Sequence, residues 1–111
     1  MSQAPLSRRQ QIESMLAQQT HDQFLRYMLA MEVGRDGQEE RCMDLFRGLM
    51  TDATPHVPSF LMAAQRLVAN EDYNEARSVL RDGIDEARKQ GESHAAAEMS
   101  ELLQRLGAMG E

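Results

Sequence analysis

The chain has 111 residues, of which 41% are hydrophobic and 27% charged, so it can bury a core as one domain without a metal or a disulfide. Its net charge is −6, and an acidic surface repels phosphate groups, which excludes nucleic acid and anionic membranes as preferred partners. The chain contains one cysteine, no export signal and no apolar run long enough to cross a bilayer, so we expect a cytoplasmic protein.

The balance of side chains indicates the kind of core. Only 5% of the residues are aromatic and nine are methionine, which predicts a core of aliphatic side chains and flexible thioethers. Three prolines and few β-branched runs argue against a sheet. The composition therefore predicts an all-α protein.

The first predicted helix follows a short N-terminal stretch, 1–5, which we expect to be disordered. Ser7 is the expected N-cap, with Gln10 as its capping-box partner. The helix then ends near Ala17. Its short apolar stripe consists of Ile12, Met15 and Leu16.

The second and third predicted helices form a hairpin. Thr20, with Gln23 three residues later, is expected to open the second helix, which covers 22–33. This helix is apolar on most of its circumference, so it needs cover on two sides. A turn at Gly37 leads into a third helix over 38–52.

A second hairpin follows a break that contains two prolines. Pro58 suits the first turn of the fourth helix, where no N–H partner is lost. The helical pattern stops at 70–72, and Asp72 with Glu75 predicts a capping box for the fifth helix. We therefore expect an αα-hairpin over 57–88.

The last predicted helix begins just after this hairpin. The fifth helix is expected to end at 89–90, with Gly91 as a left-handed cap. Ser93 is the expected N-cap of a sixth helix, which stops at Gly107. Residues 108–111 are expected to be frayed.

Side-chain sizes repeat at an interval of 34 residues in the two hairpins. The matching pairs, which we interpret as repeat-packing residues, are Ala30 with Ala64, Val33 with Leu67, Cys42 with Ala76, and Phe46 with Leu80. The turn at 36–38 falls on the turn at 70–72. A period of this length indicates stacked helix pairs. Gly48 and Gly83 lie inside helical patterns, where we expect them to permit close helix approach.

This pattern of small and large residues resembles the tetratricopeptide repeat (TPR) family. Tyr73 opens the fifth helix and Pro55 stands near a repeat end, as in that family, whereas Arg26 and Phe60 replace its early tryptophan. The resemblance implies a right-handed stack of antiparallel helix pairs, an α-solenoid of about six helices. Its expected parts, within one domain over 6–107, are a half repeat at 6–19, repeats at 21–54 and 55–90, and a terminal half repeat at 91–107.

No constellation of residues predicts catalysis. The chain has three histidines, which are His21, His56 and His94. They include no pair one turn apart and the chain has no cysteine pair, so we interpret them as solvated helix-terminus residues and not as zinc ligands. Adjacent carboxylates such as Asp85 and Glu86 point about 100° apart on a helix. We therefore expect no enzyme activity, no metal and no cofactor.

The resemblance also implies a binding surface, because the first helix of each TPR hairpin lines a concave groove. The residues at the matching positions are Phe24, Tyr27, Met28, Met31, Leu61, Met62, Gln65 and Met99. The basic residues with which some family members clamp a terminal carboxylate are missing. Methionine-rich surfaces repack around different side chains, so we expect an apolar or amphipathic segment of a partner protein.

Two alternatives use the same fold. Leu102, Leu103 and Leu106 have no following helix to cover them, which favours a homodimer sealed through the terminal helix. The chain also resembles small acidic secretion chaperones that carry this repeat and hold an apolar segment of an exported protein.

Overall fold

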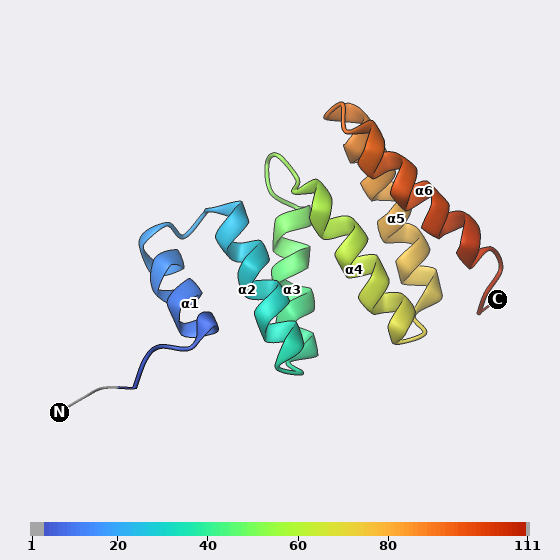
Figure 1. The fold of residues 1–111 in the computed structure, drawn as a ribbon. Coiled ribbons are helices and arrows are strands. Elements are labelled where there is room, and N and C mark those ends of the chain that lie inside the picture. Colours follow the sequence, from blue (N-terminus) through green and yellow to red (C-terminus); the bar gives the residue numbers. More distant parts are fainter. Residues whose placement is uncertain (1–3, 111) are drawn as a thin grey trace. The chain divides into compact units, whose positions relative to one another are not determined.

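The computed structural model describes residues 4–110, and these residues form helices and connections without a strand (Figure 1). The helices are α1 (Arg8–Gln18), α2 (Gln23–Arg35), α3 (Glu39–Met50), α4 (Val57–Ala69), α5 (Tyr73–Lys89) and α6 (Ser93–Leu106). The prediction of an all-α protein with about six helices is confirmed. None of the described helices is both long and apolar enough to span a bilayer.

The chain divides into two compact units where the sequence predicted one domain. The first unit, Met1–Thr51, holds α1 to α3, and the second, Asp52–Glu111, holds α4 to α6. The boundary falls at the start of the non-helical connection that contains Pro55. A proline disfavours the helical conformation of the residue before it, so α3 and α4 cannot merge across this point.

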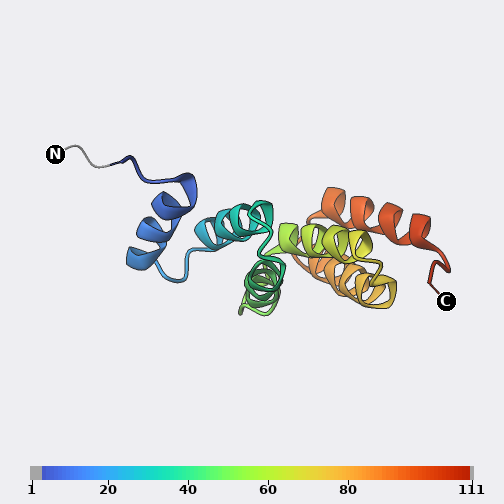
Figure 2. The same ribbon diagram turned by 90° about the horizontal axis from the view of Figure 1, so that it is seen from below.

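The first unit is built around α2, which packs against both α1 and α3 (Figure 2). Ser7 and Gln10 form the predicted capping box at the start of α1. The predicted opening of α2 at Thr20 is wrong, because Asp22 is the N-cap and accepts the Leu25 N–H at 2.8 Å. The core of this unit contains Leu29, Ala30, Val33, Cys42, Phe46 and Leu49.

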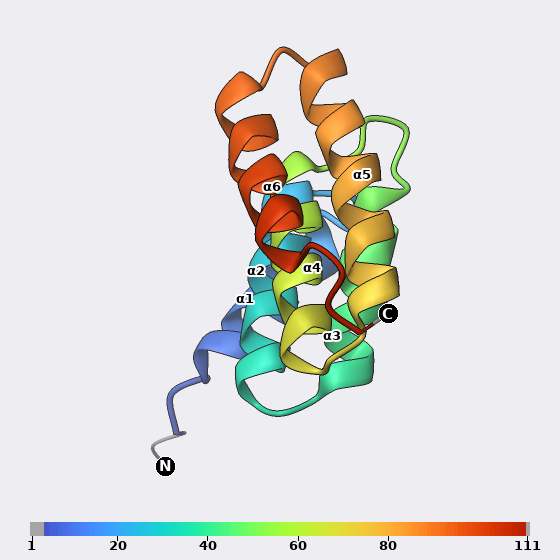
Figure 3. The ribbon, with the colours of Figure 1, turned by 90° about the vertical axis from the view of Figure 1, so that its right-hand side faces the viewer.

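In the second unit α5 packs against both α4 and α6 (Figure 3). The predicted close approach at Gly83 is confirmed: a Cβ atom added there would lie 2.6 Å from the Phe60 Cβ in α4 and 2.6 Å from the Met99 Sδ in α6. At Gly83, α5 therefore packs closely against both α4 and α6. Pro58 stands in the first turn of α4, as predicted.

One turn geometry joins α2 to α3, α4 to α5, and α5 to α6. In each turn a backbone N–H donates to the carbonyl oxygen five residues earlier, from Gln38 to Val33 (3.0 Å), from Asp72 to Leu67 (2.8 Å) and from Glu92 to Ala87 (2.7 Å). The residue before the donor has a positive φ, which is 81° at Gly37, 62° at Glu71 and 74° at Gly91. These are the features of a Schellman motif.

This turn geometry changes the capping that the sequence predicted for α5 and α6. Asp72 is the N-cap of α5, but its side chain accepts no capping hydrogen bond. The N-cap of α6 is Glu92, and Ser93 is already the first helical residue. Asp72 and Glu92 have ψ values of 64° and 71°, whereas Ser7 and Asp22, which do cap, have ψ values of 163° and 116°. A side-chain cap requires the extended conformation.

The end of the chain contacts α5 up to residue 110, the last described residue. Arg77, which is 4% exposed, donates from Nε to the Gly107 carbonyl oxygen at 3.0 Å and from Nη2 to the Met109 carbonyl oxygen. Gly110 lies against Tyr73, since a Cβ added at Gly110 would be 2.6 Å from the Tyr73 ring. Residues 107–110 therefore turn back toward the start of α5 (Figure 3). Residue 111 lies outside the described part.

Candidate partner-binding surfaces

The first candidate surface is the solvent-facing side of α2. Phe24, Tyr27, Met28 and Met31 recur at the three- and four-residue spacing of one helix face. Phe24 is 66% exposed, and the other three are half-buried. Asp22 caps α2 and Gln23 is its first helical residue, so Phe24 stands in the first turn of the helix. We call these four residues the α2 face.

The inner edge of the α2 face is anchored by a ring contact. Tyr27 and the buried Phe46 of α3 have ring centroids 6.1 Å apart and ring planes tilted by 57°. This tilted arrangement is favourable for aromatic pairs. Burial raises the pKa of the Tyr27 phenol above its ordinary value. Tyr27 thus connects the core of the first unit to its apolar surface.

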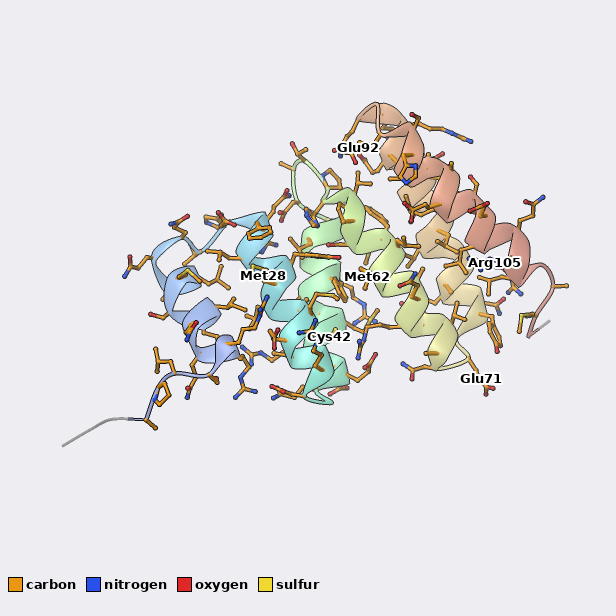
Figure 4. The ribbon with its side chains drawn as sticks, in the orientation of Figure 1. Met28, Cys42, Met62, Glu71, Glu92 and Arg105 are labelled. Carbon is orange, nitrogen blue, oxygen red and sulfur yellow. The ribbon has the colours of Figure 1, made fainter. Side chains whose placement is uncertain are left out.

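The second candidate surface lies on α4 and is smaller. Leu61 and Met62 are half-buried and Gln65 is exposed, whereas Phe60, Ala63, Ala64 and Leu67 of the same helix are buried. Figure 4 labels Met28 on α2 and Met62 on α4, one methionine from each surface. Phe60 packs against α5 at Gly83, whereas Leu61 and Met62 keep part of their area in solvent.

Met99 does not contribute to either surface. Its side chain is 1% exposed, and its Sδ lies against α5 at Gly83. The sequence placed Met99 in the groove because α6 was interpreted as the first half of a repeat. The close approach of α5 and α6 at Gly83 instead turns Met99 into the core of the second unit.

The residues interpreted as repeat packing are all inside the structure. Ala30, Val33, Cys42 and Phe46 are fully buried in the first unit. In the second unit Ala64, Ala76 and Leu80 are fully buried and Leu67 almost so. Cys42, the single cysteine of the chain, has no exposed area.

The histidines occupy three different environments. His21 is exposed just before α2, and His94 Nε2 lies 2.9 Å from Glu98 Oε1 on the surface of α6. His56, which the sequence placed in solvent, is half-buried, and its Nδ1 lies 2.7 Å from the Ser59 Oγ. Ser59 is 0% exposed, so its hydroxyl is out of reach of a substrate. This contact joins the N-cap of α4 to its first turn.

Within residues 4–110 no three side chains of His, Cys, Asp or Glu stand close enough to hold a metal ion together. One open pocket is lined by Glu101, Gln104 and Arg105 of α6, and another lies at the turn between α4 and α5 beside Gly110. No residue of the two candidate surfaces lines either pocket.

Sequence reasoning missed one residue that organises the second unit. Arg77 is buried, although arginine is rarely found inside unless its donors are satisfied. The signal was present in the repeat, because a shift of 34 residues takes Arg77 to Met43, which is also buried. The Gly107 carbonyl group lies at the predicted end of the sixth helix and that of Met109 in the stretch expected to be frayed, so no pattern indicated that Arg77 would reach them.

Comparison of the chain with models of protein families, with curated proteins and with solved structures gave no match.

Proposed function

We propose that the protein is a non-catalytic protein–protein interaction module that binds an apolar or amphipathic segment of a partner. The observation that carries the proposal is the α2 face, where an aromatic ring stands 66% exposed beside three half-buried apolar side chains. A contiguous apolar patch on a soluble protein marks a place where another molecule binds. Leu61 and Met62 on α4 are a second, smaller contact in this proposal.

The proposal includes a tetratricopeptide-like stack of helix pairs. Its support is the turn geometry, which recurs at Gly37 and Glu71 with the interval of 34 residues that the side-chain sizes follow. Matching hydrogen bonds, from Gln38 to Val33 and from Asp72 to Leu67, obey the same interval. A period expressed in backbone conformation as well as in side-chain size favours a true structural repeat.

The chemistry of the α2 face indicates its ligand. Methionine is flexible and polarisable, so Met28 and Met31 can adapt to different apolar side chains, while Phe24 and Tyr27 offer rigid area. An amphipathic helix that presents apolar residues at three- and four-residue spacing matches such a face. Charged groups of the peptide would remain in solvent.

The helix α6 exposes less apolar surface for a homodimer contact than the sequence predicted. Leu106 is buried, and Leu102 and Leu103 are half-buried on α6. The segment held by Arg77 follows directly after Leu106. Sedimentation at low concentration separates the two functions, since the interaction module requires no second copy. For the secretion chaperone, the corresponding observation is a protease-protected fragment of an exported protein that co-purifies with the chain.

Methyl NMR of the full chain tests the proposal, because methionines report on both surfaces and on the core. The probe is a synthetic amphipathic helix of leucine and lysine, and a scrambled peptide of the same composition controls for charge. We expect the methyl signals of Met28, Met31 and Met62 to shift with the amphipathic peptide alone. The signals of the buried Met43 and Met99 should stay in place. Equal shifts with both peptides, or none, would contradict the proposal.

Substitutions then locate the binding energy. Replacing Met31 and Met62 with Glu places charge on the proposed contacts and should abolish binding of the peptide while the helical circular dichroism signal stays unchanged. Met15→Glu is the matched control, since Met15 is an exposed methionine on α1 outside both surfaces. Peptide binding that survives Met31→Glu and Met62→Glu would refute the assignment.

A further inference from the structure

The helix α1 is attached to the first unit by very little apolar surface. Ile12 is its one buried residue, at 1% exposure, whereas Met15 is exposed and Leu16 half-buried. Helices of this length are marginal in isolation, so α1 depends on its docking to stay helical. Leu6, just before the helix, is also exposed.

Ion pairs join α1 to α2 and α3 within the described part of the chain. They run from Arg8 Nε to Glu32 Oε1 (2.9 Å), from Arg9 Nη1 to Asp36 Oδ2 (3.0 Å), and from Arg41 Nη2 to Glu13 Oε1 (2.9 Å). At least one partner of each pair is exposed to water. Exposed ion pairs stabilise weakly and are screened by salt.

The docked arrangement also carries features that favour release. The Arg9 Nε is buried without a hydrogen-bond partner, which weakens the docked state because water would satisfy that donor after release. Glu32 Oε1 is shared, since Arg35 of the same helix approaches it at 2.7 Å. When Arg8 leaves, Glu32 therefore retains a cation at its side.

The positions of the ion pairs indicate which side of α2 contacts α1. Arg8 and Arg9 begin α1, while their partners Glu32 and Asp36 lie at the end of α2, so the two helices run in opposite directions. Residues 25 and 29 share a helix face with 32 and 36 through steps of three and four. Both of these, Leu25 and Leu29, are buried.

We propose that α1 is a releasable cover, latched by ion pairs, that closes over the Leu25 and Leu29 side of α2 at low ionic strength and opens as salt rises. Opening exposes apolar area next to the α2 face, because Leu25 lies three residues before Met28 and therefore on the neighbouring side of the helix. The proposal stands without the partner-binding function, since it concerns a contact inside the first unit.

Hydrogen–deuterium exchange of the full chain, read by mass spectrometry, tests this directly. Raising NaCl from about 0.01 M to about 1 M shortens the Debye length from about 30 Å to about 3 Å. We expect exchange in residues 8–18 to accelerate about tenfold, the combined effect of weakening three exposed pairs. Exchange in α2 and α3 should change little. Protection of α1 that equals that of α2 and ignores salt would overturn the proposal.

A charge exchange separates the latch from a general loss of stability. Glu13→Arg should open α1 even at low salt, and adding Arg41→Glu should restore its protection by reversing the pair. Lys89→Gln breaks an ion pair of the second unit, between Lys89 and Glu86, and should leave α1 unchanged. If the double variant is no better protected than Glu13→Arg, or if Lys89→Gln opens α1 equally, the latch is refuted.

Discussion

Replacing Gly83 with Ala should destabilise the second unit, although alanine is the better helix former. Carbon atoms in contact lie about 3.5–4.0 Å apart. The new Cβ would be 2.6 Å from the Phe60 Cβ, which is bonded directly to the α4 backbone and cannot rotate away. The helices α4 and α5 must therefore move apart by about 1 Å.

The magnitude follows from two opposing contributions. Overpacking of a core costs about 1–3 kcal/mol, and a clash with an atom fixed to the backbone belongs at the upper end. Removing glycine from a helix interior gains about 1 kcal/mol. The free energy of unfolding of Gly83→Ala should thus fall by about 2 kcal/mol. With a urea dependence of about 1 kcal/mol per M, the unfolding midpoint drops by about 2 M.

Gly48→Ala is the matched control with the opposite expected sign. A Cβ at Gly48 would meet only the Arg26 Nη2 at 3.3 Å, the far end of a flexible side chain that can move. The helix-propensity gain should therefore prevail and stabilise the first unit by up to about 1 kcal/mol.

The assay must read the two units separately, and the sequence allows this. The chain has two tyrosines and no tryptophan, with Tyr27 in the first unit and Tyr73 in the second. Tyrosine fluorescence during urea unfolding reports on the second unit in a Tyr27→Phe background and on the first in a Tyr73→Phe background. A Gly83→Ala protein as stable as its parent would refute the packing argument.

Two further predictions concern backbone conformation and the buried arginine. Glu71 has a φ of 62°, and the matching position of the first hairpin carries Gly37. Glu71→Gly should therefore stabilise the second unit by about 1 kcal/mol, and Gly37→Ala should destabilise the first unit by a similar amount. Urea unfolding measures both changes. Changes of the same sign in the two variants would contradict this explanation. Arg77→Leu removes the donors to the Gly107 and Met109 carbonyl groups and should lower stability by about 2–3 kcal/mol, with faster amide exchange at the end of α6. Unchanged exchange there would show that the segment is held by other contacts.

The sequence alone determined the helices and the period that relates them. The Schellman turns at Gly37 and Glu71 repeat the predicted interval, and the size-matched residues such as Phe46 and Leu80 are buried. These features are local, or depend on side-chain volume at fixed helical spacing, so they can be predicted from the chain. The exposed position of Phe24 follows from the same spacing on α2.

Only the tertiary structure decided how polar groups and helix ends are satisfied. Asp72 and Ser93 have the right chemistry for caps, but the turns before α5 and α6 set backbone angles that prevent side-chain capping. Met99 became core because α5 approaches α6 at Gly83, and Arg77 became buried because residues 107–110 returned to it. Burial and hydrogen bonding depend on residues distant in the chain, and side-chain spacing within one helix contains no information about them.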